Sequence, residues 1–211
     1  MEADWSVALG GDDPVIVVPW AAANGPRFVD LRAGAHLIDE IEEATTSPEL
    51  RAALLHLNQP NSPFWTAKCD VWTTSVEAGD PPADPYELDA VPGETDDCAG
   101  SYIDLLPRDL SWFASFERHE QWLRAVTRRL RLVQASAARA EVILRPAEVD
   151  ALPGFAVTWV VEGCGPTARD ADAHWHHALR LTLPVIMQAR ERDESSANEL
   201  SSRLPRRAVG P

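Results

Sequence analysis

Apolar and polar residues alternate in several short stretches of the chain, and a period of two predicts β-strands. The most regular stretch is 155–162, where Phe155, Val157 and Trp159 share one face while Thr158 falls on the other. Other stretches are rich in the β-branched and aromatic residues that strands favour. They predict further strands at 14–20, 28–31, 64–74, 102–106 and 140–145.

Between these strands, apolar residues recur every three or four positions, which predicts amphipathic helices. Ser47-Pro48 supplies an N-cap and a first-turn proline for one of them. Thr167 starts the last helix as an approximate capping box with Asp170, and Pro184 is expected to kink or end it. The helices are predicted at 37–44, at 47–57, from between 109 and 115 to about 134, and from 167 onward.

A weak internal repeat indicates how these elements are arranged. Residues 28–31 (Phe-Val-Asp-Leu) resemble residues 102–105 (Tyr-Ile-Asp-Leu), and each stretch is followed by a helix and then a strand at a nearly equal offset. This order predicts an α+β fold with a ferredoxin-like β-α-β-β-α-β core, extended by an N-terminal strand and by a C-terminal strand and helix. An open, doubly wound α/β sheet is the main alternative.

One domain is expected over residues 1–189, because 211 residues of which 45% are hydrophobic suit a single core. Residues 190–211 contain few large apolar side chains, and this composition predicts a disordered tail. A sheet with its helices mainly on one face leaves the other face open. A second copy of the chain is expected to cover that face, which predicts a homodimer.

The formal net charge of −14 is distributed unevenly along the chain. Residues 1–107 carry 20 acidic and 4 basic residues, a net −16, whereas the remainder carries 13 acidic and 15 basic residues, a net +2. The acidic half would repel a phosphate backbone, so no nucleic-acid partner is expected. No apolar stretch approaches the length of a membrane span, and the acidic N-terminus lacks the positive flank of a signal peptide. No membrane association is therefore expected.

Cysteine usage bears on the compartment. Cys69, Cys98 and Cys164 are odd in number and widely spaced, and they match no zinc-binding spacing. These features predict a reduced, cytoplasmic protein without a disulfide framework.

The charge concentrates in two segments. The proline-rich loop 75–100 holds eight carboxylates and no lysine or arginine. Arg124, Arg128 and Arg131 crowd the predicted helix that follows, and arginine binds carboxylates through two parallel hydrogen bonds. This helix is a candidate binding surface for the acidic loop, for a protein partner or for a small anionic ligand. The simpler interpretation is a solvated helix face, which is favoured.

The segment Trp-Thr-Ala-Lys-Cys-Asp-Val-Trp at 65–72 is the most unusual in composition. Strand alternation places Lys68, Asp70 and Trp72 on one face and Trp65 on the other. Lys68 and Asp70 are therefore candidate catalytic residues of a small polar site, and the two tryptophans are candidate binding residues. A surface salt bridge along a strand is the simpler interpretation, and it is favoured.

A carboxylate and two imidazoles fall on one stripe of the last predicted helix. Asp170, His174 and His177 have i, i+4 and i+7 spacing, and such a set suits zinc or iron(II). The pattern matches no specific metal signature, so simple packing is favoured. Motifs for a serine nucleophile, a phosphate loop or a dinucleotide are absent from the sequence. No cofactor is indicated.

Two functions follow from these patterns. The first is a non-catalytic binding or interaction protein that uses the acidic loop and the aromatic residues of the sheet. The alternative is a small metal-assisted or acid/base enzyme with a site on the open face of the sheet. Convergence of Lys68, Asp70 and Trp72 on a pocket with any histidine would favour the enzyme.

Overall fold

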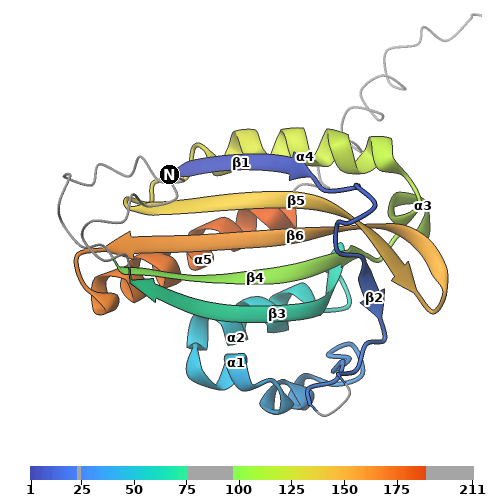
Figure 1. Cartoon of the computed structure of the whole chain (residues 1–211), viewed down its shortest axis with the longest axis horizontal. Helices are drawn as coiled ribbons and strands as arrows, with labels where there is room; N and C mark the ends of the chain where they lie inside the picture. The colour runs from blue at the N-terminus through green and yellow to red at the C-terminus, as the bar shows by residue number, and fades with distance from the viewer. Residues whose placement is uncertain (23–24, 76–96, 189–211) are drawn as a thin grey trace, which may run out of the picture.

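The structure is a computed structural model that describes residues 1–22, 25–75 and 97–188. Its strands form one mixed sheet in the order β1-β5-β6-β4-β3, and β2 pairs with β5 at the same edge as β1 (Figure 1). The pairings of β5 with β1 and β2 are parallel, and the other pairings are antiparallel. The strands are β1 (Glu2–Val7), β2 (Ile16–Val18), β3 (Phe64–Ser75), β4 (Asp97–Pro107), β5 (Ala138–Val149) and β6 (Leu152–Gly165).

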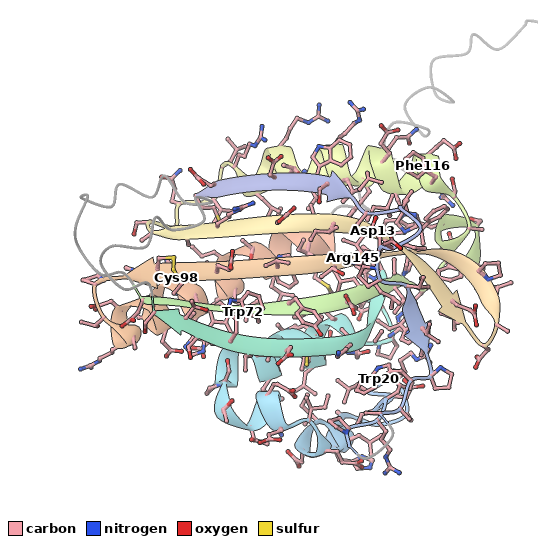
Figure 2. The ribbon with its side chains drawn as sticks, viewed as in Figure 1. Asp13, Trp20, Trp72, Cys98, Phe116 and Arg145 are labelled. Carbon is pink, nitrogen blue, oxygen red and sulfur yellow. A yellow bond between two sulfur atoms is a disulfide. The ribbon has the colours of Figure 1, made fainter. Side chains whose placement is uncertain are left out.

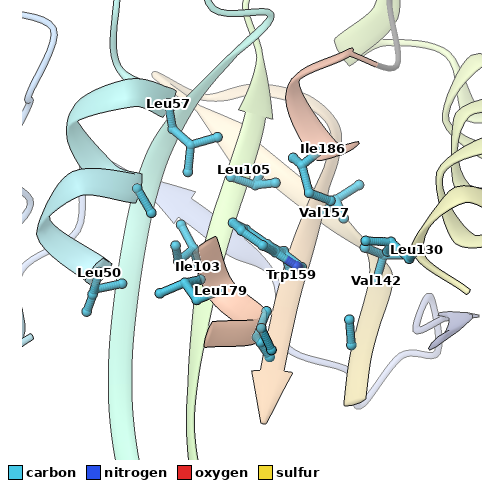
Figure 3. Close-up of a cluster of buried hydrophobic side chains, with 14 of the residues drawn as sticks. Leu50, Leu57, Ile103, Leu105, Leu130, Val142, Val157, Trp159, Leu179 and Ile186 are labelled. Carbon is cyan, nitrogen blue, oxygen red and sulfur yellow. The ribbon is translucent and has the colours of Figure 1, made fainter. Parts of the chain in front are cut away.

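Helices cover one face of this sheet, which Figure 1 shows as the face turned away from the viewer. Trp159 on β6 is fully buried there, at the centre of the main hydrophobic core (Figure 3). Ser47 and Thr167 cap their helices as predicted, and the last helix continues through Pro184. The helices are η1 (Ala35–Glu40), α1 (Glu42–Thr46), α2 (Pro48–Leu57), α3 (Leu110–Phe113), α4 (Phe116–Leu130) and α5 (Ala168–Met187). None of them is long and apolar enough to cross a membrane.

The α+β class is confirmed, whereas the strand predicted at 28–31 is wrong. These residues form an irregular segment and a turn, in which the Asp30 carboxylate accepts hydrogen bonds from the backbone N–H and the guanidinium of Arg32. Such local bonding by aspartate competes with strand pairing. The first β-α-β unit therefore lacks its first strand, and the parallel edge formed by β1 and β2 gives a mixed sheet instead of the ferredoxin-like arrangement.

A disulfide joins Cys98 on β4 to Cys164 on β6. The two residues face each other across the antiparallel pair of strands, with their Cα atoms 4.2 Å apart. The prediction of fully reduced cysteines is therefore wrong for this pair. The spacing of the cysteines in the sequence does not reveal the bond, because the register of the two strands brings them together. Cys69 is free, and burial raises the pKa of its thiol to about 12, so it is not a reactive thiolate.

The backbone of α5 packs closely against β6 at Gly163. A Cβ atom at this position would lie 2.6 Å from the carbonyl carbon of His174 and would collide with the amide of Trp175. Gly163→Ala is expected to lower the free energy of unfolding by about 2 kcal/mol, because the helix must move away from the sheet. Urea unfolding measures this loss, and Gly11→Ala is the matched control because a Cβ there meets nothing within 4 Å. Equal stability of the two variants would contradict this packing.

Candidate functional site

A cavity of about 370 Å³ lies between the open face of the sheet and the segment 14–20 that contains β2. In Figure 2, Arg145 and Trp20 both lie at the end of the sheet where β2 is found, whereas Cys98 lies at the opposite end. The lining includes strongly polar side chains from four strands of the sheet. These are Lys68 from β3, Tyr102 and Asp104 from β4, Arg145 from β5 and Thr158 from β6.

The segment 14–20 is fixed over the sheet by packing and by hydrogen bonds. Ile16 and Val18 are buried in a second hydrophobic cluster on the open face, together with Trp65 and Ala67 of β3. The indole Nε1 of Trp20 donates a hydrogen bond to the carbonyl oxygen of Ala67 over 2.9 Å. This packing forms one wall of the cavity from a segment distant in sequence from its floor.

Asp104 is the most deeply buried ionisable group of the cavity, with 7% of the residue exposed. Thr158 Oγ1 donates a 2.6 Å hydrogen bond to its Oδ1, and the same hydroxyl accepts one from Arg145 Nε over 3.0 Å. Burial raises the pKa of Asp104 to about 6, against the opposing effects of Thr158, Arg145 and Lys68. A carboxyl group with this pKa in a cavity can take up and release a proton near neutral pH.

Lys68 lies beside Tyr102 at the mouth of the cavity. Their side-chain hydrogen bond raises the pKa of Lys68, whereas burial is the main cause that raises the pKa of Tyr102. The pair therefore consists of an ammonium and a neutral phenol, with the ammonium donating to the phenol oxygen. The Lys68 Nζ atom also lies 5.6 Å from the centre of the Trp20 ring. The phenol proton of Tyr102 remains available for a ligand oxygen.

The strict alternation predicted for 65–72 is wrong, because β3 contains a β-bulge. The pairing with β4 shifts between Thr66 and Cys69, so Ala67 and Lys68 both line the cavity. Trp65 packs into the cluster on the open face, while Cys69 packs against the core beneath the helices. Lys68 is thus brought to the same face as Trp65, from which strict alternation would have separated it.

The other predicted residues of β3 lie near the cavity but do not line it. Asp70 lines a second cavity of about 460 Å³, which shares Trp20, Ala67 and Lys68 with the first. Trp72 packs over Gly100 and beside Tyr102, with the two ring centres 6.5 Å apart. Trp65 is buried, and the Arg32 guanidinium lies 3.7 Å from its ring centre. Lys68 is therefore the only one of these four predicted residues that lines the first cavity.

The predicted arginine surface lies on α4, away from this cavity. Arg124 pairs with Glu120 over 2.7 Å, and Arg128 is exposed. Arg131 donates to the carbonyl oxygen of Ala3 over 2.8 Å and so attaches α4 to β1. The acidic residues 77–96 lie outside the described residues, so their pairing with these arginines stays a prediction.

The predicted metal ligands of α5 have local partners. The Asp170 carboxylate accepts a hydrogen bond from Thr167, His174 contacts the carbonyl oxygen of Cys164, and His177 contacts Arg180. Within the part of the chain that the structure describes, no three His, Cys, Asp or Glu side chains are grouped so that they could hold a metal ion.

Four polar residues of the cavity were not predicted to be functional: Tyr102, Asp104, Arg145 and Thr158. A usable signal was present at Asp104, because a carboxylate interrupts the apolar run Ile103, Leu105 and Leu106 of a central strand.

Searches of protein-family models, curated proteins and solved structures find no match to this chain.

Proposed function

We propose that the protein is an acid/base enzyme that transfers a proton on a small carbonyl compound bound in the cavity beneath segment 14–20. The observation that carries this proposal is Asp104, a buried carboxyl group with a pKa of about 6 that lines a cavity together with Lys68 and Tyr102. Perturbed carboxyl groups in clefts are typical of acid/base sites.

The proposed proton transfer uses these groups of the cavity. The Asp104 carboxylate takes a proton from the carbon next to the carbonyl, so that a C–H bond breaks and a carboxylic O–H bond forms. The electron pair of the C–H bond becomes a carbon–carbon double bond, and the carbonyl π electrons move onto the oxygen. The Tyr102 phenol donates a hydrogen bond to this oxyanion, and the adjacent Lys68 ammonium stabilises its charge. Return of the proton from Asp104 to carbon completes the cycle.

Thr158 and Arg145 position the carboxyl group. The Thr158 hydroxyl holds Oδ1 of Asp104, so Oδ2 is the oxygen expected to carry the proton. Arg145 orients the Thr158 hydroxyl through its own hydrogen bond and favours the ionised form of Asp104. The base is therefore ionised above about pH 6 although it is buried.

Proton transfer is measured directly by the exchange of carbon-bound protons in D₂O. We expect the protein to accelerate the loss of the α-proton NMR signals of one or more ketones among acetone, cyclohexanone and indanone. The rate is expected to rise as pH increases through about 6, because Asp104 must be ionised to act as a base. Asp104→Asn is expected to lower the catalysed rate about 100-fold or more.

Asp172→Asn is the matched control for this substitution. Asp172 is an exposed carboxylate on α5, on the helix side of the sheet, and its loss is expected to leave exchange unchanged. Exchange that is not accelerated for any of the three ketones, or that persists in Asp104→Asn, would overturn the proposal.

The interaction function predicted from the acidic loop stays a prediction, as do the homodimer and the cytoplasmic location. No observation on the described residues favours them over the acid/base site.

A further inference from the structure

The geometry points to the class of substrate: a cyclic, largely apolar carbonyl compound whose ring lies against Val15, Val17 and Trp20. This inference rests on the proposed function and extends it to the part of the ligand that does not react.

Segment 14–20 exposes apolar side chains at the cavity. Val15 is 51% exposed and Val17 is 45% exposed, and both line the cavity together with Ile16, which like Val18 is buried in the second hydrophobic cluster. Exposed apolar surface costs about 25 cal/mol per Å² relative to buried surface. An apolar ligand surface that covers the two valines would recover this free energy.

Most polar groups and most apolar groups of the cavity come from different walls, although the Lys68 ammonium lies 5.6 Å from the centre of the Trp20 ring. The sheet supplies the charged and hydroxyl groups, while segment 14–20 supplies Pro14, the two valines, Ile16 and Trp20. A ligand that makes favourable contacts with both walls has a polar oxygen on the side of Tyr102 and Lys68 and an apolar body on the other side. The cavity therefore selects an amphipathic molecule and disfavours a small polar one such as acetone.

The shape of the apolar wall favours a ring. Trp20 is held in place by its 2.9 Å hydrogen bond to Ala67, so its indole forms a fixed, flat surface. Aromatic rings pack well against such a surface in offset or edge-to-face arrangements. The volume of about 370 Å³ is near the lower end for ligand sites, which span roughly 300–1,000 Å³, and suits one compact ring system.

Binding of ketones measured by isothermal titration at about pH 7 tests this inference without requiring turnover. Wild-type protein is expected to bind indanone at least about tenfold more tightly than acetone. The double substitution Val15→Ser with Val17→Ser is expected to weaken indanone binding about tenfold, because hydroxymethyl groups replace the apolar contacts. Val17→Ala is a milder second variant. It is expected to weaken indanone binding about threefold, because it removes part of the apolar contact.

Leu132→Ser is the matched control, because Leu132 is 75% exposed and lies just beyond α4, outside this cavity. It is expected to bind indanone as the wild type does. Indanone binding no tighter than acetone binding, or unchanged binding in both valine variants, would overturn the inference. The two proposals fail separately: tight indanone binding without proton exchange contradicts only the reaction, whereas exchange without preference for a ring contradicts only the substrate class.

Discussion

Asp104→Asn is expected to change the free energy of unfolding in a pH-dependent way. The difference between the variant and the wild type is expected to be about 3 kcal/mol more favourable to the variant at about pH 8 than at about pH 3. The pKa of this carboxyl group is about 6 in the folded protein, against 3.8 for an aspartate exposed to water. As pH rises between these values, the unfolded chain releases the proton while the folded chain keeps it, so stability falls. Above about pH 6 the carboxyl group is ionised in both the folded and the unfolded chain, and stability falls no further. The difference between the two pKa values corresponds to a loss of about 3 kcal/mol.

Asparagine removes this cost because it has no carboxyl group to ionise, and its amide oxygen can still accept the hydrogen bond from Thr158. Urea unfolding of both proteins across this pH range measures the effect as a difference in the free energy of unfolding. Asp172→Asn removes the same charge from an exposed position and controls for the change in net charge. A difference between Asp104→Asn and wild type that does not vary with pH would contradict the burial of an ionisable group at this site.

Loss of the disulfide is expected to have the largest effect on stability. The Cys98–Cys164 bond closes a loop with a sequence separation of 66 residues. In the chain-entropy description, a loop of this length stabilises the folded state by about 4 kcal/mol, because it restricts the unfolded chain. Replacing both cysteines by alanine is therefore expected to lower the free energy of unfolding by about this amount in urea unfolding experiments.

Reduction provides an independent check of the same bond. Adding dithiothreitol to the wild type is expected to reproduce the loss seen in the double variant, and to leave the double variant unchanged. Cys69→Ala is the control for removing a thiol, since Cys69 is the free cysteine of the chain. If dithiothreitol did not change wild-type stability, the assignment of a structural disulfide would be wrong.

The regular elements were predictable because their signals are local. The alternation at 155–162 lies within β6, and the N-caps Ser47 and Thr167 begin α2 and α5 as expected. The strand β1 was missed because it is short and only Ala3 among its six residues is buried. Its apolar residues Ala3, Trp5 and Val7 do alternate with polar ones, but over only six positions, and its pairing with β5 depends on residues more than 130 positions away.

Of the site, the sequence predicts only Lys68, because the segment around it on β3 is unusual in composition. The predicted partner Asp70 pairs with Tyr102 but lines the neighbouring cavity, and the bulge between Thr66 and Cys69 places Lys68 on the same face as Trp65, which strict alternation does not. A bulge is a mismatch between two strands, so the spacing of residues within one strand cannot reveal it.

The sequence by itself determined the α+β class, most strands and helices, the helix caps and the uneven charge, because all of these depend on neighbouring residues and on composition. Only the tertiary structure decided that Asp104 is buried beside Lys68 and Tyr102, that Trp20 covers them and that Cys98 meets Cys164. These contacts join residues from separate strands and from the N-terminal segment. Burial and register set the pKa of Asp104 and form the disulfide, and both arise only when the sheet has assembled.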